Sequence, residues 1–178
     1  TYVDVGRQYH VGLGLPPDLS MHRTDTFVNV PALPKLKNFY RMLTFISCAK
    51  TMAARCALNV PAVSEPRFAG EALHTALELS QYPAAELEGL LRVNAKIAAE
   101  NRLRYHDFCS EDNRPMPAIG AYTGVVFKRI APADFTTDDF LFAQEHLRIT
   151  SFLYGLLRPL DGIRPYRLEG DVRLAANG

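Results

Sequence analysis

Residues 88–105 read EGLLRVNAKIAAENRLRY, and this stretch decides how the middle of the chain folds. Two helical patterns meet at residues 93–95 with no proline or glycine between them. The spacing of the apolar residues predicts a short helix from Pro83 to about Arg92 and a longer one from about residue 95 to Phe108. The sequence therefore predicts two helices joined by a corner of two or three residues.

The start of the second helix is a candidate anion site. Its first backbone amides have no partner inside the helix and lie at the positive end of the helix dipole. Asn94 suits the corner because Asn adopts left-handed conformations more readily than most residues, and Arg92, Lys96 and Arg102 would add positive charge around it. These features are those of a helix-hairpin-helix that grips a nucleic-acid backbone without reading bases. The other interpretation is an ordinary helical corner whose amides are capped by Asn94 or by water.

The composition limits the class of protein. The chain has 178 residues, 48% of them hydrophobic and 22% charged, which is typical of a globular domain with its own core. The net charge of +1 does not indicate bulk attraction to nucleic acid, although 15 of the 20 cationic residues are Arg, which favours bidentate contacts to phosphate or carboxylate. No apolar run approaches the roughly 20 residues of a membrane helix.

Cysteine and histidine spacing argues against a metal site. Cys48, Cys56 and Cys109 form no C-x-x-C pair, which is typical of a protein kept in a reducing cytoplasm. No two of the five histidines stand at the i, i+4 spacing that places two ligands on one helix face. We therefore predict no metal and no cofactor, and direct iron binding ranks last among the hypotheses.

The remaining pattern predicts a mixed α and β class. We expect a strand at residues 43–46, a helix at 66–80, a short buried strand at 118–122, and a helix from Thr136 or Thr137 to about residue 148. Residues 1–41 are rich in proline and glycine, and they begin with Thr rather than Met. We expect them to be a leader or an extension that is loop-rich or disordered, with the folded domain beginning at Met42.

A second hypothesis, an enzyme, rests on the loop after the first predicted strand. Ser47-Cys48-Ala49-Lys50 matches the S-x-x-K motif of penicillin-recognising enzymes, but neither S-D-N nor K-T-G follows. The other interpretation is a polar loop at the carboxyl end of a strand, where α/β proteins place binding sites. A site around Ser47, Lys50 and Thr51, with Tyr122 and Arg158, would act on a phosphorylated or nucleotide-like molecule.

Four stretches carry a resemblance to a known family: MLTFISCAKTM (42–52), LLRVNAKIAAENRLRYHDF (90–108), AYTGVVFKRI (121–130) and FAQEHLRITSFLYGLLRPLDGIRPYRLEGDVRL (142–174). Residues 42–178 resemble the peroxide stress resistance protein YaaA family, while residues 1–41 are unmatched. The resemblance implies an α+β "cantaloupe" fold with a helix-hairpin-helix and a positively charged cleft. It implies a cytoplasmic bacterial protein that binds DNA and limits iron-driven DNA damage, with no established enzymatic activity. Family members continue beyond residue 178, so we expect the fold to be incomplete at this end.

The family's hairpin maps onto LEGLLRVNAKIAAENRL, with Arg92, Asn94, Ala95 and Lys96 at the phosphate-facing turn. Typical hairpins have glycines at this turn, so the departure here puts close backbone approach to phosphate in doubt. The resemblance further implies a cationic lining of the cleft, which we assign to Lys50, Lys128, Arg129, Arg148, Arg158, Arg164 and Arg167. The expected partner is DNA, bound without sequence preference, and no membrane.

Overall fold

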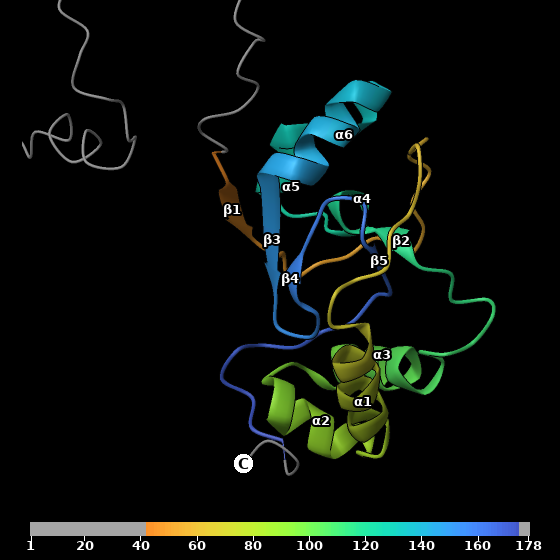
Figure 1. Cartoon of the computed structure of the whole chain (residues 1–178). Helices are drawn as coiled ribbons and strands as arrows, with labels where there is room; N and C mark the ends of the chain where they lie inside the picture. Colours follow the sequence, from red (N-terminus) through yellow and green to blue (C-terminus); the bar gives the residue numbers. More distant parts are fainter. Residues whose placement is uncertain (1–41, 175–178) are drawn as a thin grey trace, which may run out of the picture. The chain divides into compact units, whose positions relative to one another are not determined.

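The computed structural model describes residues 42–174, and these residues mix helices with small sheets (Figure 1). The α+β class is confirmed, whereas the predicted leader at residues 1–41 lies outside the described residues. The elements in chain order are β1 (Thr44–Ser47), α1 (Ala69–Ser80), α2 (Ala84–Leu91), α3 (Ala95–His106), β2 (Met116–Pro117), α4 (Ala118–Ala121), α5 (Val125–Ile130), a 3₁₀ turn (Pro132–Asp134), α6 (Thr137–His146), β3 (Leu147–Ser151), β4 (Gly155–Leu157) and β5 (Gly162–Ile163).

A three-stranded sheet in the order β1-β3-β4 forms the centre of the fold. β1 and β3 are parallel, with Thr44 opposite Leu147 and Ser47 opposite Thr150, while β3 and β4 are antiparallel. The amide of Cys48 extends this ladder by donating to the carbonyl of Thr150 at 3.1 Å. The carboxyl ends of β1 and β3 therefore lie side by side, although about 100 residues of chain separate them.

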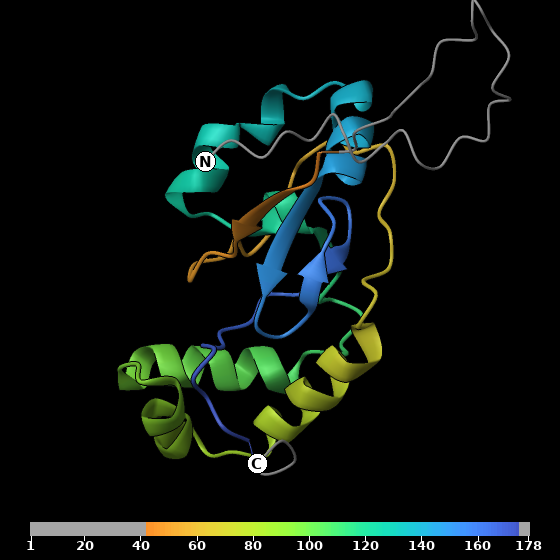
Figure 2. The same ribbon diagram turned by 60° about the vertical axis from the view of Figure 1, so that its left-hand side comes forward.

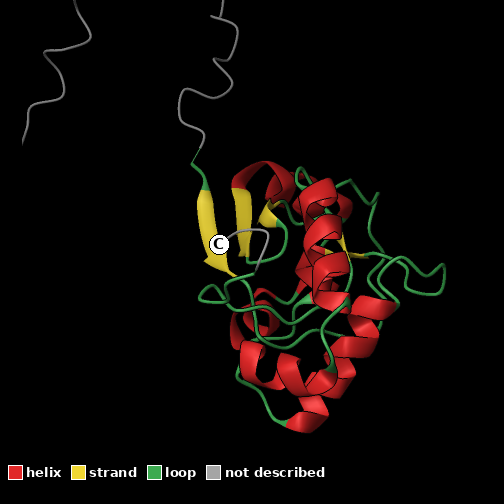
Figure 3. Ribbon diagram, turned by 90° about the horizontal axis from the view of Figure 1, so that it is seen from below, coloured by secondary structure: helices red, strands yellow, loops and turns green. Residues whose placement is uncertain are grey.

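Helices lie beyond both ends of the strands (Figures 1 and 2). α1, α2 and α3 pack together on one side, α5 and α6 lie on the other, and α4 packs against β2 and β5. The view from below in Figure 3 shows the strands gathered at one side of the picture, with helices beside them. Each helix of this first group turns an apolar face inward, and the side chains of Leu79, Leu87, Leu91, Ala98 and Tyr105 are fully or almost fully buried. The amphipathic periodicity of the sequence therefore explains why one face of each of these helices is buried.

The two helices predicted from residues 83 to 108 are confirmed as α2 and α3, with boundaries within two residues of the prediction. α1 begins later than predicted, at Ala69, after an N-cap at Phe68. Ser64, just before the predicted start at residue 66, donates its hydroxyl to the buried Asp161 carboxylate at 2.7 Å. The side chain of Ser64 is therefore held by a distant acceptor and does not cap α1.

The strand predicted at residues 118–122 is wrong, because residues 118–121 form the helical turn α4. The amides of Ala118 and Ile119 donate to the carbonyls of Asp161 and Pro159 at 2.9 and 3.0 Å. Those tertiary bonds satisfy the start of the turn and bury Ala118, Ile119 and Ala121. Tertiary contacts here override the local strand preference of a short apolar run.

α6 has the predicted start but a different end. Thr136 is its N-cap, and a capping box joins the side chains and backbones of Thr136 and Asp139. The hydroxyl and the backbone amide of Thr136 donate to the Asp139 carboxylate at 2.7 and 2.9 Å, and these two hydrogen bonds lower the pKa of that carboxyl. The helix ends at His146, because residues 147–151 pair with β1 as a strand instead of continuing the helix to residue 148.

Candidate functional site

The corner between α2 and α3 is formed by residues 92–94. The left-handed residue is Arg92, with φ of 49°, and not Asn94, which was predicted to fill that role. The amide of Val93 returns to the carbonyl of Glu88 at 3.1 Å, so the chain closes α2 in the manner of a helix C-cap without glycine. A non-glycine residue with this backbone conformation is uncommon. The chain therefore turns at the corner through an arginine in the left-handed conformation.

Asn94 begins α3. Its backbone is extended, and its Oδ1 accepts a hydrogen bond from the amide of Ile97 at 2.9 Å. Asn94 thus caps one amide of the helix start, as the ordinary-corner interpretation expects. Within residues 42–174, no hydrogen bond engages the amides of Ala95 and Lys96. Residues 94–96 are exposed, so the first two amides of α3 lie at the surface, at the positive end of the dipole of this 12-residue helix.

The charges at the corner are also at the surface. The guanidinium of Arg92 forms an ion pair with the Asp171 carboxylate, and both side chains are mostly exposed. Lys96 and Arg102 are exposed, and within the described part of the chain neither makes an ion pair. The Glu100 carboxylate is turned to Arg104, with 2.5 Å between Oε1 and Nη2. The corner is neither buried nor closed by the glutamates of the adjoining helices, but one carboxylate from the C-terminal segment reaches it.

A cleft of about 130 Å³ lies where the carboxyl ends of β1 and β3 meet, and we call it the sheet-edge cleft. It occupies the place that the sequence predicted for a polar loop with Ser47 and Lys50. Side chains from the loop after β1, from β3 and from the C-terminal segment line it: Ser47, Cys48, Lys50, Thr150, Phe152, Tyr166, Arg167 and Glu169.

Two cations and one carboxylate meet in this cleft. Glu169 Oε1 lies 2.9 Å from Arg167 Nη2 and 3.4 Å from Lys50 Nζ. Arg167 Nη1 also donates to the backbone carbonyl of Lys50 at 3.2 Å. These ion pairs do not align as hydrogen bonds, and within the described residues Arg167 Nε and Glu169 Oε1 are buried without a hydrogen-bond partner. A buried donor without a hydrogen-bond partner is costly.

Hydroxyl groups form a chain beneath the cleft. The Tyr166 hydroxyl lies 2.9 Å from that of Tyr122 and 2.7 Å from that of Ser151, and Ser151 Oγ accepts from the amide of Tyr154 at 2.9 Å. Burial raises the pKa of Tyr166 to about 12 and also raises that of Tyr122. Both phenols are neutral at neutral pH, so the chain positions the cleft wall rather than supplying charge.

The S-x-x-K motif does not have the geometry of a nucleophile site. Residues 48–50 follow β1 as irregular structure, so no helix carries Lys50 one turn beyond Ser47. Burial also raises the pKa of the neighbouring Cys48 thiol, which disfavours its reactive thiolate form. Thr51 does not line the cleft, because its hydroxyl accepts a hydrogen bond from Thr123 at 2.9 Å.

The other predicted cations do not gather in the same cleft. Arg158 pairs with the buried Asp161 at 3.0 Å and shares a separate hollow of about 580 Å³ with Arg148. Lys128 lines a hollow beside α5, and Arg129 is exposed at the end of that helix. Lys50 and Arg158, both named in the enzyme hypothesis, therefore lie in different hollows, and Lys50 shares its cleft with Arg167 instead.

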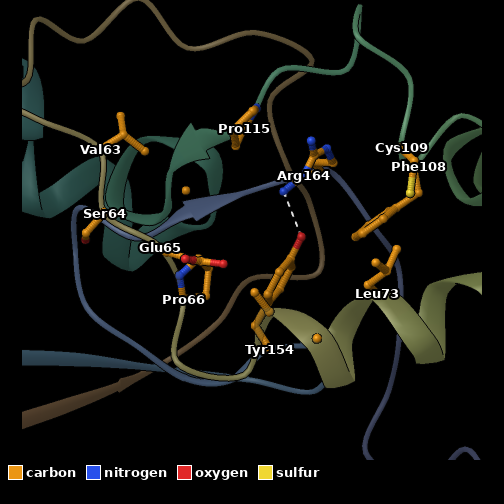
Figure 4. A pocket seen from close by; sticks show the side chains of 13 residues that line it. Val63, Ser64, Glu65, Pro66, Leu73, Phe108, Cys109, Pro115, Tyr154 and Arg164 are labelled. Atoms are coloured by element: carbon orange, nitrogen blue, oxygen red, sulfur yellow. Dashed lines mark hydrogen bonds between the residues drawn. The ribbon is translucent and has the colours of Figure 1, made fainter.

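Arg164 belongs to another hollow, of about 540 Å³, between the loop at residues 63–66 and the first turns of α1 (Figure 4). Its Nε donates to the carbonyl of Asn113 at 2.9 Å, and its guanidinium lies 5.8 Å from the ring centroid of Phe108. Its backbone amide donates to the Tyr154 hydroxyl at 3.0 Å, the bond drawn in Figure 4. Arg164 is thus fixed away from both the corner and the sheet-edge cleft.

Sequence reasoning missed the residues that oppose the cations. Glu169 and Asp171 stand two residues apart in LEGDV and pair with cations of the cleft and of the corner, respectively. The local signal was present in this acidic pair after Arg167, but the partners Lys50 and Arg92 are distant in sequence. Among residues 42–174, no three His, Cys, Asp or Glu side chains are placed to hold a metal ion, and each helix is too short or too polar to cross a bilayer.

Comparison with known proteins gives the family. The model of the family described as peroxide stress protein YaaA matches residues 42–178. The chain belongs to this family. It is similar to UPF0246 proteins of Phocaeicola vulgatus, at 60% identity over 137 residues, and Bacteroides thetaiotaomicron, at 59% over 137 residues, each match covering 77% of this chain. A UPF0246 protein of Crocosphaera subtropica is 42% identical over 128 residues, or 72% of this chain. The chain spans about half the length of these relatives, with 54%, 53% and 50% of each covered.

Proposed function

We propose that the chain serves peroxide stress protection in the cytoplasm by binding the DNA backbone at the α2–α3 corner, and so limits iron-driven damage to DNA. Membership of the peroxide stress family supports the physiological half of this proposal. The observation that carries the molecular half is the exposed start of α3, where the amides of Ala95 and Lys96 face solvent between Arg92 and the exposed Arg102.

The corner has the properties of a phosphate clamp. Backbone amides and a helix dipole attract an anion without regard to base identity, so they position a duplex but do not read its sequence. Arg92 and Lys96 add cationic contacts on each side of the helix start. Because each phosphate that is neutralised releases condensed counterions, the affinity is expected to fall steeply with salt.

The test measures duplex binding by fluorescence anisotropy across a range of salt concentrations. Arg92→Ala with Lys96→Ala should weaken binding equally for duplexes of unrelated sequence and lower the slope of log affinity against log salt by roughly 1–2, at about 0.9 per lost phosphate contact. Arg55→Ala with Arg114→Ala is the matched control, because it removes the same charge from two exposed sites that lie outside the corner. Equal losses in the two double variants would show that only net charge matters and would remove the corner from the proposal.

An enzyme acting on a phosphorylated or nucleotide-like molecule is the second candidate. The observation in its favour is that Lys50 and Arg167 meet in one cleft at the carboxyl ends of parallel strands, where α/β proteins bind ligands. Calorimetric titration with ATP and with inorganic phosphate tests it, with Lys50→Ala as the comparison. Heat that disappears in Lys50→Ala supports the site, whereas no saturable heat with either probe contradicts it.

A further inference from the structure

One short segment neutralises both candidate anion sites. We call residues 168–172 the acidic strap. Its Glu169 lies between Lys50 and Arg167 in the sheet-edge cleft, and its Asp171 pairs with Arg92 at the α2–α3 corner. Figures 1 and 2 both show the chain near its C-terminal end running from the strands down past α3 toward α2. The strap therefore follows a line that connects the two sites.

The strap is anchored at its beginning. The buried hydroxyl of Tyr105 on α3 donates to the backbone carbonyl of Arg167, and Leu168 and Val172 pack against the main core. Gly170 lies so close to Phe152 that an added Cβ would be 2.4 Å from the ring. The backbone path of the strap is thus set by packing, and its two carboxylates are delivered to the cations by that path.

The ionic contacts of the strap are easier to exchange than its backbone packing. The side chains of Lys50 and Arg92 are 71% and 76% exposed, and that of Asp171 is 55% exposed. Ion pairs between exposed side chains contribute little, because water and salt screen them. In the cleft, Arg167 Nε is buried without a partner, so Glu169 does not fully satisfy the cation that it faces.

We infer that Glu169 and Asp171 hold the places of two nearby phosphates of a bound nucleic-acid strand, and that the strand displaces both carboxylates when it binds. This inference rests on the proposed function, because it takes DNA as the partner. It extends the binding surface from the corner, along the strap, to the cleft with Lys50 and Arg167. The two carboxylates then compete with an incoming polyanion for the same cations and lower its affinity for the chain.

The spacing of the two acids fits a polyanion better than a single anion. Residues 169–172 form a turn in which the amide of Val172 donates to the carbonyl of Glu169 at 3.3 Å, and two residues of chain span at most about 7 Å. A nucleic-acid strand carries one charge per roughly 3.4 Å of helix axis, so one or two nucleotides cover that distance. A lone phosphate would replace one carboxylate and leave the other pair closed.

The experiment compares the whole chain with Glu169→Gln/Asp171→Asn in duplex binding by anisotropy. The matched control is Glu111→Gln/Asp138→Asn, which removes the same two negative charges from exposed positions outside the strap. The strap variant is expected to bind roughly three- to tenfold more tightly than the control variant, because its cations are no longer paired with carboxylates in the free chain. Because the same phosphates are contacted, the two salt slopes should be equal.

Equal affinities in the two double variants would overturn the inference while the wild-type salt-dependent binding still upheld the proposed function. If no chain binds the duplex, the proposed function and the inference both fail. Asp171→Asn alone guards against misfolding, because its pair is exposed; it should tighten binding roughly two- to threefold. Inorganic phosphate at matched ionic strength should not release the duplex; release by phosphate but not by chloride would assign the cleft to a small anion and overturn the inference.

Discussion

The sheet-edge cleft and the α2–α3 corner use the same chemistry under opposite conditions. In each, an arginine meets a carboxylate of the acidic strap. In the cleft, the side chains of Arg167 and Glu169 are only 18% and 22% exposed, whereas at the corner those of Arg92 and Asp171 are 76% and 55% exposed. The difference predicts that the cleft pair contributes more to the stability of the fold than the corner pair does.

Burial explains this division. A partly buried charge that loses its partner has no water to take over, so the remaining charge is costly. An exposed charge is rehydrated at once. Losing a partner should therefore cost more stability in the cleft than at the corner.

The largest expected effect is the difference in stability between variants that lack the arginine of the cleft and the arginine of the corner. Arg167→Ala should lower the free energy of unfolding by about 2–3 kcal/mol, because Glu169 and the Lys50 carbonyl lose a partly buried partner. Arg92→Ala should cost under about 1 kcal/mol, as expected for an exposed pair. Urea unfolding of the two variants measures the contrast, and equal losses would show that burial does not separate the two sites.

Alkaline pH should affect the buried region first. Burial raises the pKa of Tyr154 and Tyr166 to about 12 and also raises those of Tyr105 and Tyr122. An unfolded tyrosine has a pKa of about 10, so the folded state holds these protons more tightly. The resulting stability is fully present below pH 10 and is lost as the pH rises toward and through 12.

Urea midpoints measured between pH 9 and 12, together with tyrosinate absorbance, check this expectation. Tyr166→Phe should reduce the pH dependence of the midpoint, because one of the shifted groups is gone. Full ionisation of the four tyrosines near pH 10 in a chain that remains folded would contradict the burial of the hydroxyl chain.

A smaller effect is expected from the cap of α3. Asn94→Ala should cost about 1 kcal/mol, because the amide of Ile97 loses its side-chain acceptor. Asn59→Ala, in an exposed loop, serves as the control and should be neutral within about 0.5 kcal/mol. Urea unfolding gives the free energy of unfolding of both variants. No loss of stability in Asn94→Ala would mean that water fully replaces the Asn94 side chain as acceptor for the amide of Ile97.

The elements that the sequence predicted well are those whose signal is local. α2 and α3 follow from the spacing of apolar residues, and the start of α6 follows from Thr136 with acids after it. Elements fixed by distant partners were not predictable. Leu147 leaves the helical pattern because it pairs with Thr44, and residues 118–121 form a helix because their amides bond to the chain after β4.

The candidate sites divide in the same way. The exposed corner is contained in one stretch, so its place was predicted, although the left-handed residue is Arg92 and not Asn94. The cleft is assembled from segments more than 100 residues apart; Lys50 was predicted, but Glu169 was not. A single sequence shows which side chains carry charge, whereas the parallel pairing of β1 with β3 decides which of them meet.

The central claim is that the exposed amides at the start of α3 bind DNA phosphate. The most direct measurement is the two-dimensional amide NMR spectrum of the isotope-labelled chain during titration with a short duplex of arbitrary sequence. We predict that the amides of Ala95 and Lys96 shift most, that the shifts saturate, and that added salt reverses them. Saturating shifts centred on Lys128 and Arg129 of α5, with α3 unchanged, would contradict the account.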